Sequence, residues 1–187
     1  MQVRLRLALA AALACLGSSP ALAAAVPMDA AAMAQSASAV AYTVTGILGY
    51  ARWPELSAAP IRLCILGSVA HGDVLAGLSG EQPLSNGRPV ITRSLALHSP
   101  NIAAHCDAIY TGHLDAASRQ ALYERIAERA VLSISEDAGD CTIGPMFCLL
   151  VHGPSVSFRV NLDAVARSGV RIHPRVLKLG YGRAGQP

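Results

Sequence analysis

Short apolar segments typical of buried β-strands alternate with helical segments along most of this 187-residue chain, and this alternation limits the fold more than any other feature. The segment 61–66 is apolar at both odd and even positions, which predicts a central strand covered on both faces. The pattern indicates an α/β fold, a single-domain sandwich with helices flanking a mixed, mostly parallel sheet. Strands are predicted at 61–66, 90–95, 108–111, 131–134, 147–151 and 155–160, and helices at 37–52, 73–79, 115–129, 161–168 and 174–179.

Local signals set several boundaries of these elements. Pro54 disfavours a helical conformation at the residue before it, so the first helix should end near Trp53. Asp115 is a typical N-cap residue for the helix that follows it. Gly153 and Pro154 separate two apolar runs, which predicts a hairpin and therefore an antiparallel portion of the sheet near the C-terminus.

The N-terminus has the pattern of an export signal. Arg4 and Arg6 precede an apolar stretch from Leu7 to Leu16, and Ala21-Leu22-Ala23 has the small-residue form of a cleavage site. The apolar stretch is shorter than the roughly 18 to 20 residues that a membrane-spanning helix needs. We therefore expect residues 1–23 to be a signal peptide.

The chain outside the folded domain is predicted to be short. Residues 24–35 are Ala-rich and are expected to form a flexible segment, the domain is expected to cover residues 36–180, and residues 181–187 form a tail. Cys15 lies at the end of the apolar stretch and could instead be the lipid-modified cysteine of a lipoprotein. Ala12 stands where such a site usually has leucine, which weakens that alternative.

Four cysteines remain after the signal, and an even number in an exported chain indicates two disulfides. Cys141 and Cys148 enclose six residues with a Gly-Pro turn, so a local bridge between them closes easily. That pairing leaves Cys64 with Cys106, each beside an apolar strand segment. A metal site formed by Cys141, Cys148 and His152, or a redox-active pair, are alternatives, but the Cys-x2-Cys spacing of zinc sites is absent.

Composition and motifs exclude several functional classes. The chain is 52% hydrophobic and carries a formal charge of only +3, with basic residues scattered, so neither a disordered chain nor a nucleic-acid partner is expected. The six histidines are spread singly, without a metal-binding His-Glu-x-x-His motif, and no Gly-x-Ser-x-Gly or nucleotide-binding glycine motif occurs. We therefore predict a protein that is not an enzyme and that needs no cofactor or metal. An exported enzyme is a further alternative, because the members of a catalytic triad can be distant in sequence.

Five segments together resemble the YfiR-like family of periplasmic proteins. The most specific is the run Asn-Leu-Asp-Ala-x-x-Arg-Ser-Gly-Val-Arg-Ile that begins at Asn161, within the segment 158–177. The others are Arg52-Trp53-Pro54, the strand 61–67, the stretch 106–114 (CDAIYTGHL) and residues 144–147. The resemblance extends over roughly residues 36–180.

The resemblance implies a non-catalytic periplasmic regulator. Such proteins inhibit an inner-membrane diguanylate cyclase through its periplasmic sensor region, which lowers cyclic di-GMP and restrains biofilm formation, and an outer-membrane OmpA-like lipoprotein sequesters them. A homodimer is a further expected state. The resemblance implies the same two bridges, Cys64–Cys106 and Cys141–Cys148, and bridges of this kind would make the regulator redox-sensitive. An exported small-ligand-binding protein is the alternative function.

Residues for partner binding are transferred from the resemblance. It places a partner-facing surface at Phe158, Arg159, Asn161 and Val165, with Arg52 nearby, and an exposed apolar patch is expected around Phe158 and Val165. Arg159 is basic where the resemblance leads us to expect an acidic residue, and such a reversal would change which cyclase is bound. Ordinary packing of a strand and a helix is the alternative role for these residues.

A small-ligand site is predicted near the C-terminus. Arg171 and His173 are two residues apart, so on an extended segment they would project to the same side. With Leu177 as an apolar floor, they could hold a carboxylated or phosphorylated aromatic molecule. A solvated strand end is the alternative.

Overall fold

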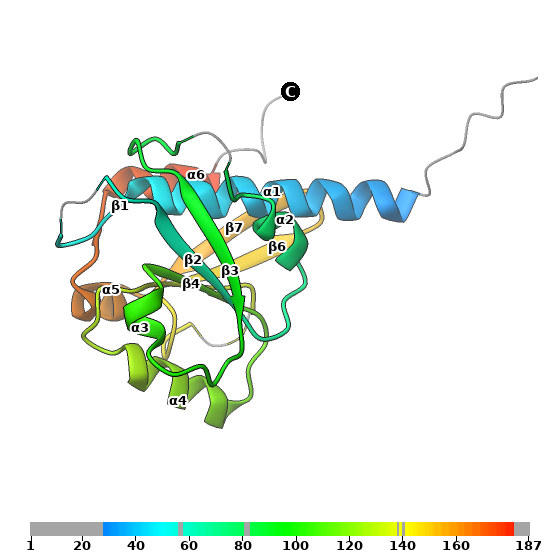
Figure 1. Cartoon of the computed structure of the whole chain (residues 1–187). Helices are drawn as coiled ribbons and strands as arrows, with labels where there is room; N and C mark the ends of the chain where they lie inside the picture. The colour runs from blue at the N-terminus through cyan, green and yellow to red at the C-terminus, as the bar shows by residue number, and fades with distance from the viewer. Residues whose placement is uncertain (1–27, 56–57, 81–82, 138, 140, 182–187) are drawn as a thin grey trace, which may run out of the picture.

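The computed structural model describes residues 28–55, 58–80, 83–137, 139 and 141–181, and it has the predicted α/β architecture (Figure 1). The predicted signal peptide 1–23, Cys15 and all but the first residue of the predicted tail lie outside the described residues. Among the described residues, no helix has the length and apolar character needed to cross a membrane.

A six-stranded sheet in the order β3-β2-β4-β5-β6-β7 forms the centre of the domain. All neighbouring strands are parallel except β6 and β7, which form the predicted antiparallel hairpin. Its strands are β2 (Ile61–Leu66), β3 (Val90–Leu95), β4 (Ala108–Thr111), β5 (Leu132–Ser135), β6 (Phe147–His152) and β7 (Ser155–Val160). Strand β2 lies inside the sheet, and Leu63 and Cys64 on its opposite faces are both fully buried, as predicted.

One face of the sheet is covered by helix α1 (Met28–Tyr50). Val40, Val44, Ile47 and Leu48 recur at three- and four-residue steps, and all four are fully buried against the sheet. The helix begins at Met28 rather than at residue 37, so most of the segment predicted to be flexible is helical and extends past the sheet (Figure 1). A run of alanines favours a helix even without apolar contacts, which explains the earlier start.

The first helix ends two residues before its predicted end at Arg52. Ala51 and Arg52 form strand β1, which pairs antiparallel with strand β8 (Arg171–Ile172) in a separate two-stranded sheet. Backbone pairing with a segment 120 residues away along the chain therefore overrides the local helical pattern.

The other face of the sheet is covered by α3 (Ile102–His105) and α4 (Ala116–Ile126). Asp115 caps α4 as predicted, because its side chain accepts a hydrogen bond of 2.9 Å from the Ser118 N–H. The helix ends at Ile126, three residues before the predicted end, and Glu128 has a left-handed backbone with φ of 56°. The short helix α3 was not predicted.

Shorter helices complete the domain. Helix α2 (Gly72–Ala76) packs beside α1, and α5 (Leu162–Ser168) follows β7. Gly169, with φ of 74°, ends α5 in a conformation that favours glycine. The predicted final helical turn is a 3-10 turn, η1 (Pro174–Val176), followed by α6 (Leu177–Tyr181), which packs on β7.

Candidate functional site

Two disulfides join the four cysteines in the predicted pairing. Cys64 on β2 is bonded to Cys106 just before β4, and Cys141 is bonded to Cys148 on β6, with Cα–Cα distances of 5.8 and 6.0 Å. All four cysteines are buried. The first bridge connects two adjacent strands of the central sheet, and the second closes the loop that leads into β6.

Asn161 has a buried structural role beside the short disulfide. Only 7% of the residue is exposed. Its Oδ1 accepts a hydrogen bond from the Ala164 N–H at 3.0 Å and so caps α5, while its Nδ2 donates to the Thr142 carbonyl at 3.0 Å. Asn161 therefore fixes the start of α5 and the loop closed by Cys141 and Cys148, and it is not itself a surface group.

Phe158 and Val165, where an exposed apolar patch is predicted, are only partly exposed. Phe158 packs edge-on against Phe147, with ring centroids 5.5 Å apart, and both Phe158 and Val165 pack on the hydrophobic core between α1 and the sheet. Arg159 points to the opposite face of β7, where it is exposed and donates a hydrogen bond to the Gly139 carbonyl. Of the residues predicted in this region, Arg159 is the exposed one, Phe158 and Val165 are half-buried, and Asn161 is buried.

Two other apolar side chains are exposed next to Asn161 and its partner Thr142. Leu162 is 76% exposed and Ile143 is 73% exposed. The hydrogen bond from Asn161 to Thr142 brings these two chain neighbours to the same region of the surface. Neither residue was predicted from the sequence, because their exposure depends on how α5 and the disulfide loop pack and not on a local motif.

Arg52 lies close to the predicted ligand residues, on the strand that pairs with β8 just after α5 in the chain. Strands β1 and β8 place Arg52 directly opposite Arg171, and both are exposed. The His173 ring stacks on Tyr50, with centroids 6.1 Å apart, and its Nδ1 accepts from the Arg175 N–H. Leu177 is 51% exposed at the start of α6. The structure thus groups Arg52 with Arg171 and His173 on an open surface.

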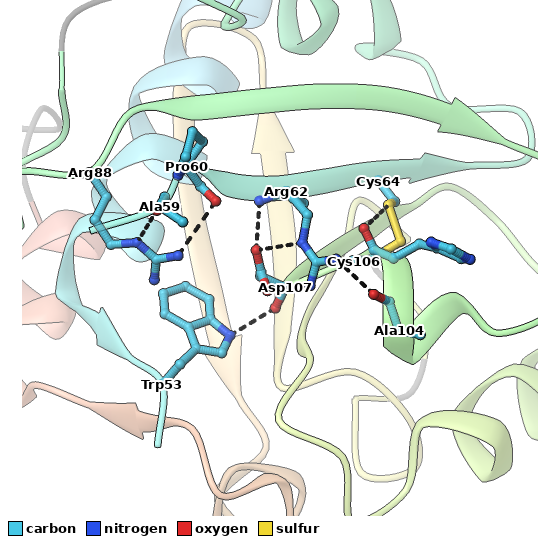
Figure 2. A network of polar contacts seen from close by, with 10 residues as sticks. Trp53, Ala59, Pro60, Arg62, Cys64, Arg88, Ala104, Cys106 and Asp107 are labelled. Carbon is cyan, nitrogen blue, oxygen red and sulfur yellow. Dashed lines mark hydrogen bonds and ion pairs between the residues drawn. A yellow bond between two sulfur atoms is a disulfide. The ribbon is translucent and has the colours of Figure 1, made fainter. Parts of the chain in front are cut away.

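A polar network that includes Trp53, the residue after Arg52, joins β2 to the segment before β4 (Figure 2). Arg62 donates from Nη2 to Asp107 Oδ1 at 2.8 Å and from Nε to Oδ2 at 3.1 Å, and its backbone N–H also donates to Oδ2. The Trp53 indole N–H donates to the Asp107 carbonyl, and the Arg88 guanidinium lies 5.1 Å from the centre of the Trp53 ring. The network ties the Arg-Trp-Pro segment to the Cys64–Cys106 disulfide.

The ion pair shifts the pKa values of both of its members. The hydrogen bond to Asp107 raises the pKa of Arg62 above its usual value. Burial alone would raise the pKa of Asp107, but the hydrogen bonds and charge of Arg62 outweigh it, so the pKa of this carboxyl lies below its usual value. Both groups are therefore charged at neutral pH.

A second polar network lies at the opposite, carboxyl end of the parallel strands. Glu136 accepts hydrogen bonds from the Ala70 N–H and from the Tyr110 hydroxyl at 2.9 Å, and its Oε2 lies 2.8 Å from His71 Nδ1. The Nε2 of His71 is 3.3 Å from the Ser36 hydroxyl on α1. Burial, and then the charge of Glu136, raises the pKa of Tyr110, so this hydroxyl stays protonated.

This second network connects helix α1 to the sheet. Ser36, His71 and Glu136 contact one another in the way that the serine, histidine and carboxylate of a hydrolase triad do. Catalysis of that kind also needs N–H donors aimed at a developing oxyanion. The nearby Ala70 N–H is already bonded to Glu136, and Ser36 lies within a continuous helix. In the part of the chain that the structure describes, no group of three or more His, Cys, Asp or Glu residues could hold a metal ion.

A family model described as YfiR/HmsC-like matches residues 37–181. This span runs from the middle of α1 to the last residue of α6, so it includes both disulfides, the Arg62–Asp107 network and every member of the second network except Ser36.

Proposed function

The chain belongs to the YfiR/HmsC-like family, and we propose that it is a periplasmic regulator that inhibits an inner-membrane diguanylate cyclase and so lowers cyclic di-GMP. The observation that carries this proposal is the family match, which extends over nearly all of the described domain. The two buried disulfides support export to an oxidising compartment. The regulator would act by binding and not by catalysis.

The finer parts of the proposal concern its partners. The cyclase is bound through its periplasmic sensor region, and an outer-membrane OmpA-like lipoprotein sequesters the regulator and releases the cyclase. We also propose that the protein forms a homodimer. Because both disulfides lie in the buried interior, their reduction would weaken the fold and with it the inhibition.

We place the cyclase-binding surface at the exposed side chains Ile143, Arg159 and Leu162. Ile143 and Leu162 are large apolar side chains whose contact with water is unfavourable, and exposed apolar patches mark interaction surfaces. Asn161 supports the surface from beneath by holding the disulfide loop against α5. Phe158 and Val165 support it by packing on the core.

Deletion of the gene is expected to raise cyclic di-GMP and biofilm formation only while the cyclase gene is intact, because inhibition has no target without the cyclase. Cyclic di-GMP is measured in extracts of the wild type, the single deletion and the double deletion. An unchanged level in the single deletion would contradict the proposal. Purified protein should also capture the cyclase from detergent-solubilised envelopes, whereas retention of a metabolite alone would favour the small-ligand-binding alternative.

Substitution Leu162→Lys is expected to reduce cyclase capture several-fold without changing the melting temperature. The side chain is 76% exposed, and surface substitutions usually change stability by less than ~0.5 kcal/mol, whereas a lysine buried in an apolar contact loses its hydration. The matched control is Met33→Lys on α1, an apolar side chain that is 67% exposed elsewhere. Val165→Lys should instead lower the melting temperature, because Val165 packs on the core. Full capture by a folded Leu162→Lys variant would place the partner elsewhere.

A further inference from the structure

A cleft of about 830 Å³ opens on the α3 and α4 side of the sheet, at the amino ends of β2, β4 and β5. Five of the fifteen Lys and Arg residues of the chain line it, against two of the twelve acidic residues, Glu55 and Asp107. The arginines are Arg62, Arg88, Arg93, Arg125 and Arg129. Positive charge is therefore concentrated in this cleft, although the chain as a whole is close to neutral.

Three of these arginines are held in place by the protein. Arg62 is fixed by Asp107 and also donates to the Ala104 carbonyl at 2.7 Å. Arg88 donates to the Ala59 carbonyl at 2.7 Å and lies over the Trp53 ring, as Figure 2 shows. Arg125 donates to the carbonyls of Leu97 and Ser99. Each guanidinium has five N–H groups, so some of its hydrogen-bond donors remain available to a ligand after these contacts are made.

The other two arginines have no such support. The side chains of Arg93 on β3 and Arg129 after α4 are exposed and make no hydrogen bond or ion pair with any residue that the structure describes. The two acidic residues of the cleft leave an excess of three positive charges, and the hydrogen bonds of the Asp107 carboxylate go to Arg62 and not to Arg93 or Arg129. Like charges that line one cleft repel one another, and an anion between them would remove that cost.

We propose that this cleft binds a small organic polyanion carrying two or more phosphate or carboxylate groups. Its volume lies within the roughly 300–1,000 Å³ range of small-molecule sites. Guanidinium groups match both kinds of oxyanion in a two-point geometry. Trp53, Ile91 and Ile102 line the cleft and would contact the carbon skeleton of the ligand. The proposal goes beyond cyclase inhibition and does not depend on it.

The test is calorimetric titration of the purified, oxidised protein with pyrophosphate and with citrate. Binding is expected for at least one of them, and the tighter of the two identifies the preferred group. The double variant Arg93→Gln, Arg129→Gln should lose at least tenfold in affinity and keep the wild-type circular dichroism spectrum, because neither side chain has a structural partner among the described residues. The matched control is Arg175→Gln, an exposed arginine that is not part of the cleft and should bind normally.

Three results would overturn the proposal. The first is the absence of binding by either anion at millimolar concentration. The second is an equal loss of affinity in Arg175→Gln and the double variant, which would mean general charge attraction. The third is binding of a poly-aspartate peptide through Arg93 and Arg129 without binding of the small anions, which would assign the cleft to an acidic protein segment. None of these measurements involves the cyclase, so failure here leaves cyclase inhibition to its own test.

Discussion

Replacing both Cys64 and Cys106 by alanine is expected to lower the free energy of unfolding by about 4 kcal/mol. The two residues are 42 positions apart, and a loop of that length gains about this much entropy in the unfolded state when the crosslink is lost. Both cysteines are at most 1% exposed, so the alanines also remove packing from the hydrophobic cluster between the sheet and helices α3 and α4. Because a small domain is stabilised by only about 5–15 kcal/mol in total, this loss is large.

The matched control for this variant is the double alanine substitution at Cys141 and Cys148. Their separation is only 7, so the same entropy argument gives about 2.5 kcal/mol. Urea denaturation of the two variants and the wild type measures the difference, and non-reducing peptide mass spectrometry checks the pairing. A larger loss from the short bridge than from the long one would contradict the argument. The short bridge should instead affect cyclase capture, because it closes the loop that carries Ile143.

The strands of the sheet were predictable because each is a short apolar run with a clear end. The segments at β2, β3 and β4 have the predicted bounds, and the hairpin of β6 and β7 turns at Gly153 and Pro154. The cap at Asp115 was also predictable, because it depends on a residue type and on the N–H three positions later. These features are local in the sequence, so local patterns are enough.

The features that sequence reasoning missed depend on contacts between distant segments. Arg62 and Asp107 are 45 positions apart, and no periodic pattern connects them. Asn161 was expected on a surface, but its side chain is taken up by Ala164 and Thr142 inside the domain. The early start of α1 was missed because an Ala-rich segment lacks the contrast between apolar and polar faces on which helix periodicity depends.

Two crosslinks of different chemistry join the same pair of segments. The Cys64–Cys106 bridge and the Arg62–Asp107 ion pair both connect β2 to the residues just before β4. Asp107 follows Cys106 directly, so loss of the disulfide should also loosen the ion pair. The stability effects of the cysteine and Asp107 variants should therefore not be additive, as expected for residues in one network.

Substitution Asp107→Asn is expected to lower the free energy of unfolding by about 2 kcal/mol at pH 7, because it breaks charge-assisted hydrogen bonds to Arg62. The Arg62 side chain is 37% exposed, so solvent keeps the effect below the roughly 3–5 kcal/mol of a fully buried pair. The matched control is Asp163→Asn in the first turn of α5, which breaks an exposed pair with Arg167 and should lower stability by less than about 1 kcal/mol.

The effect of Asp107→Asn should depend on pH in a direction set by the pKa of this carboxyl. Its pKa lies below the usual value in the folded protein, so the stabilisation is fully present above the unfolded-state pKa of about 3.9 and is lost as the pH falls through the folded-state pKa. Thermal melts of the wild type and the variant should therefore differ most near neutral pH and converge in strong acid. A constant difference across this range would show that the carboxylate charge is not what stabilises the contact between β2 and the start of β4.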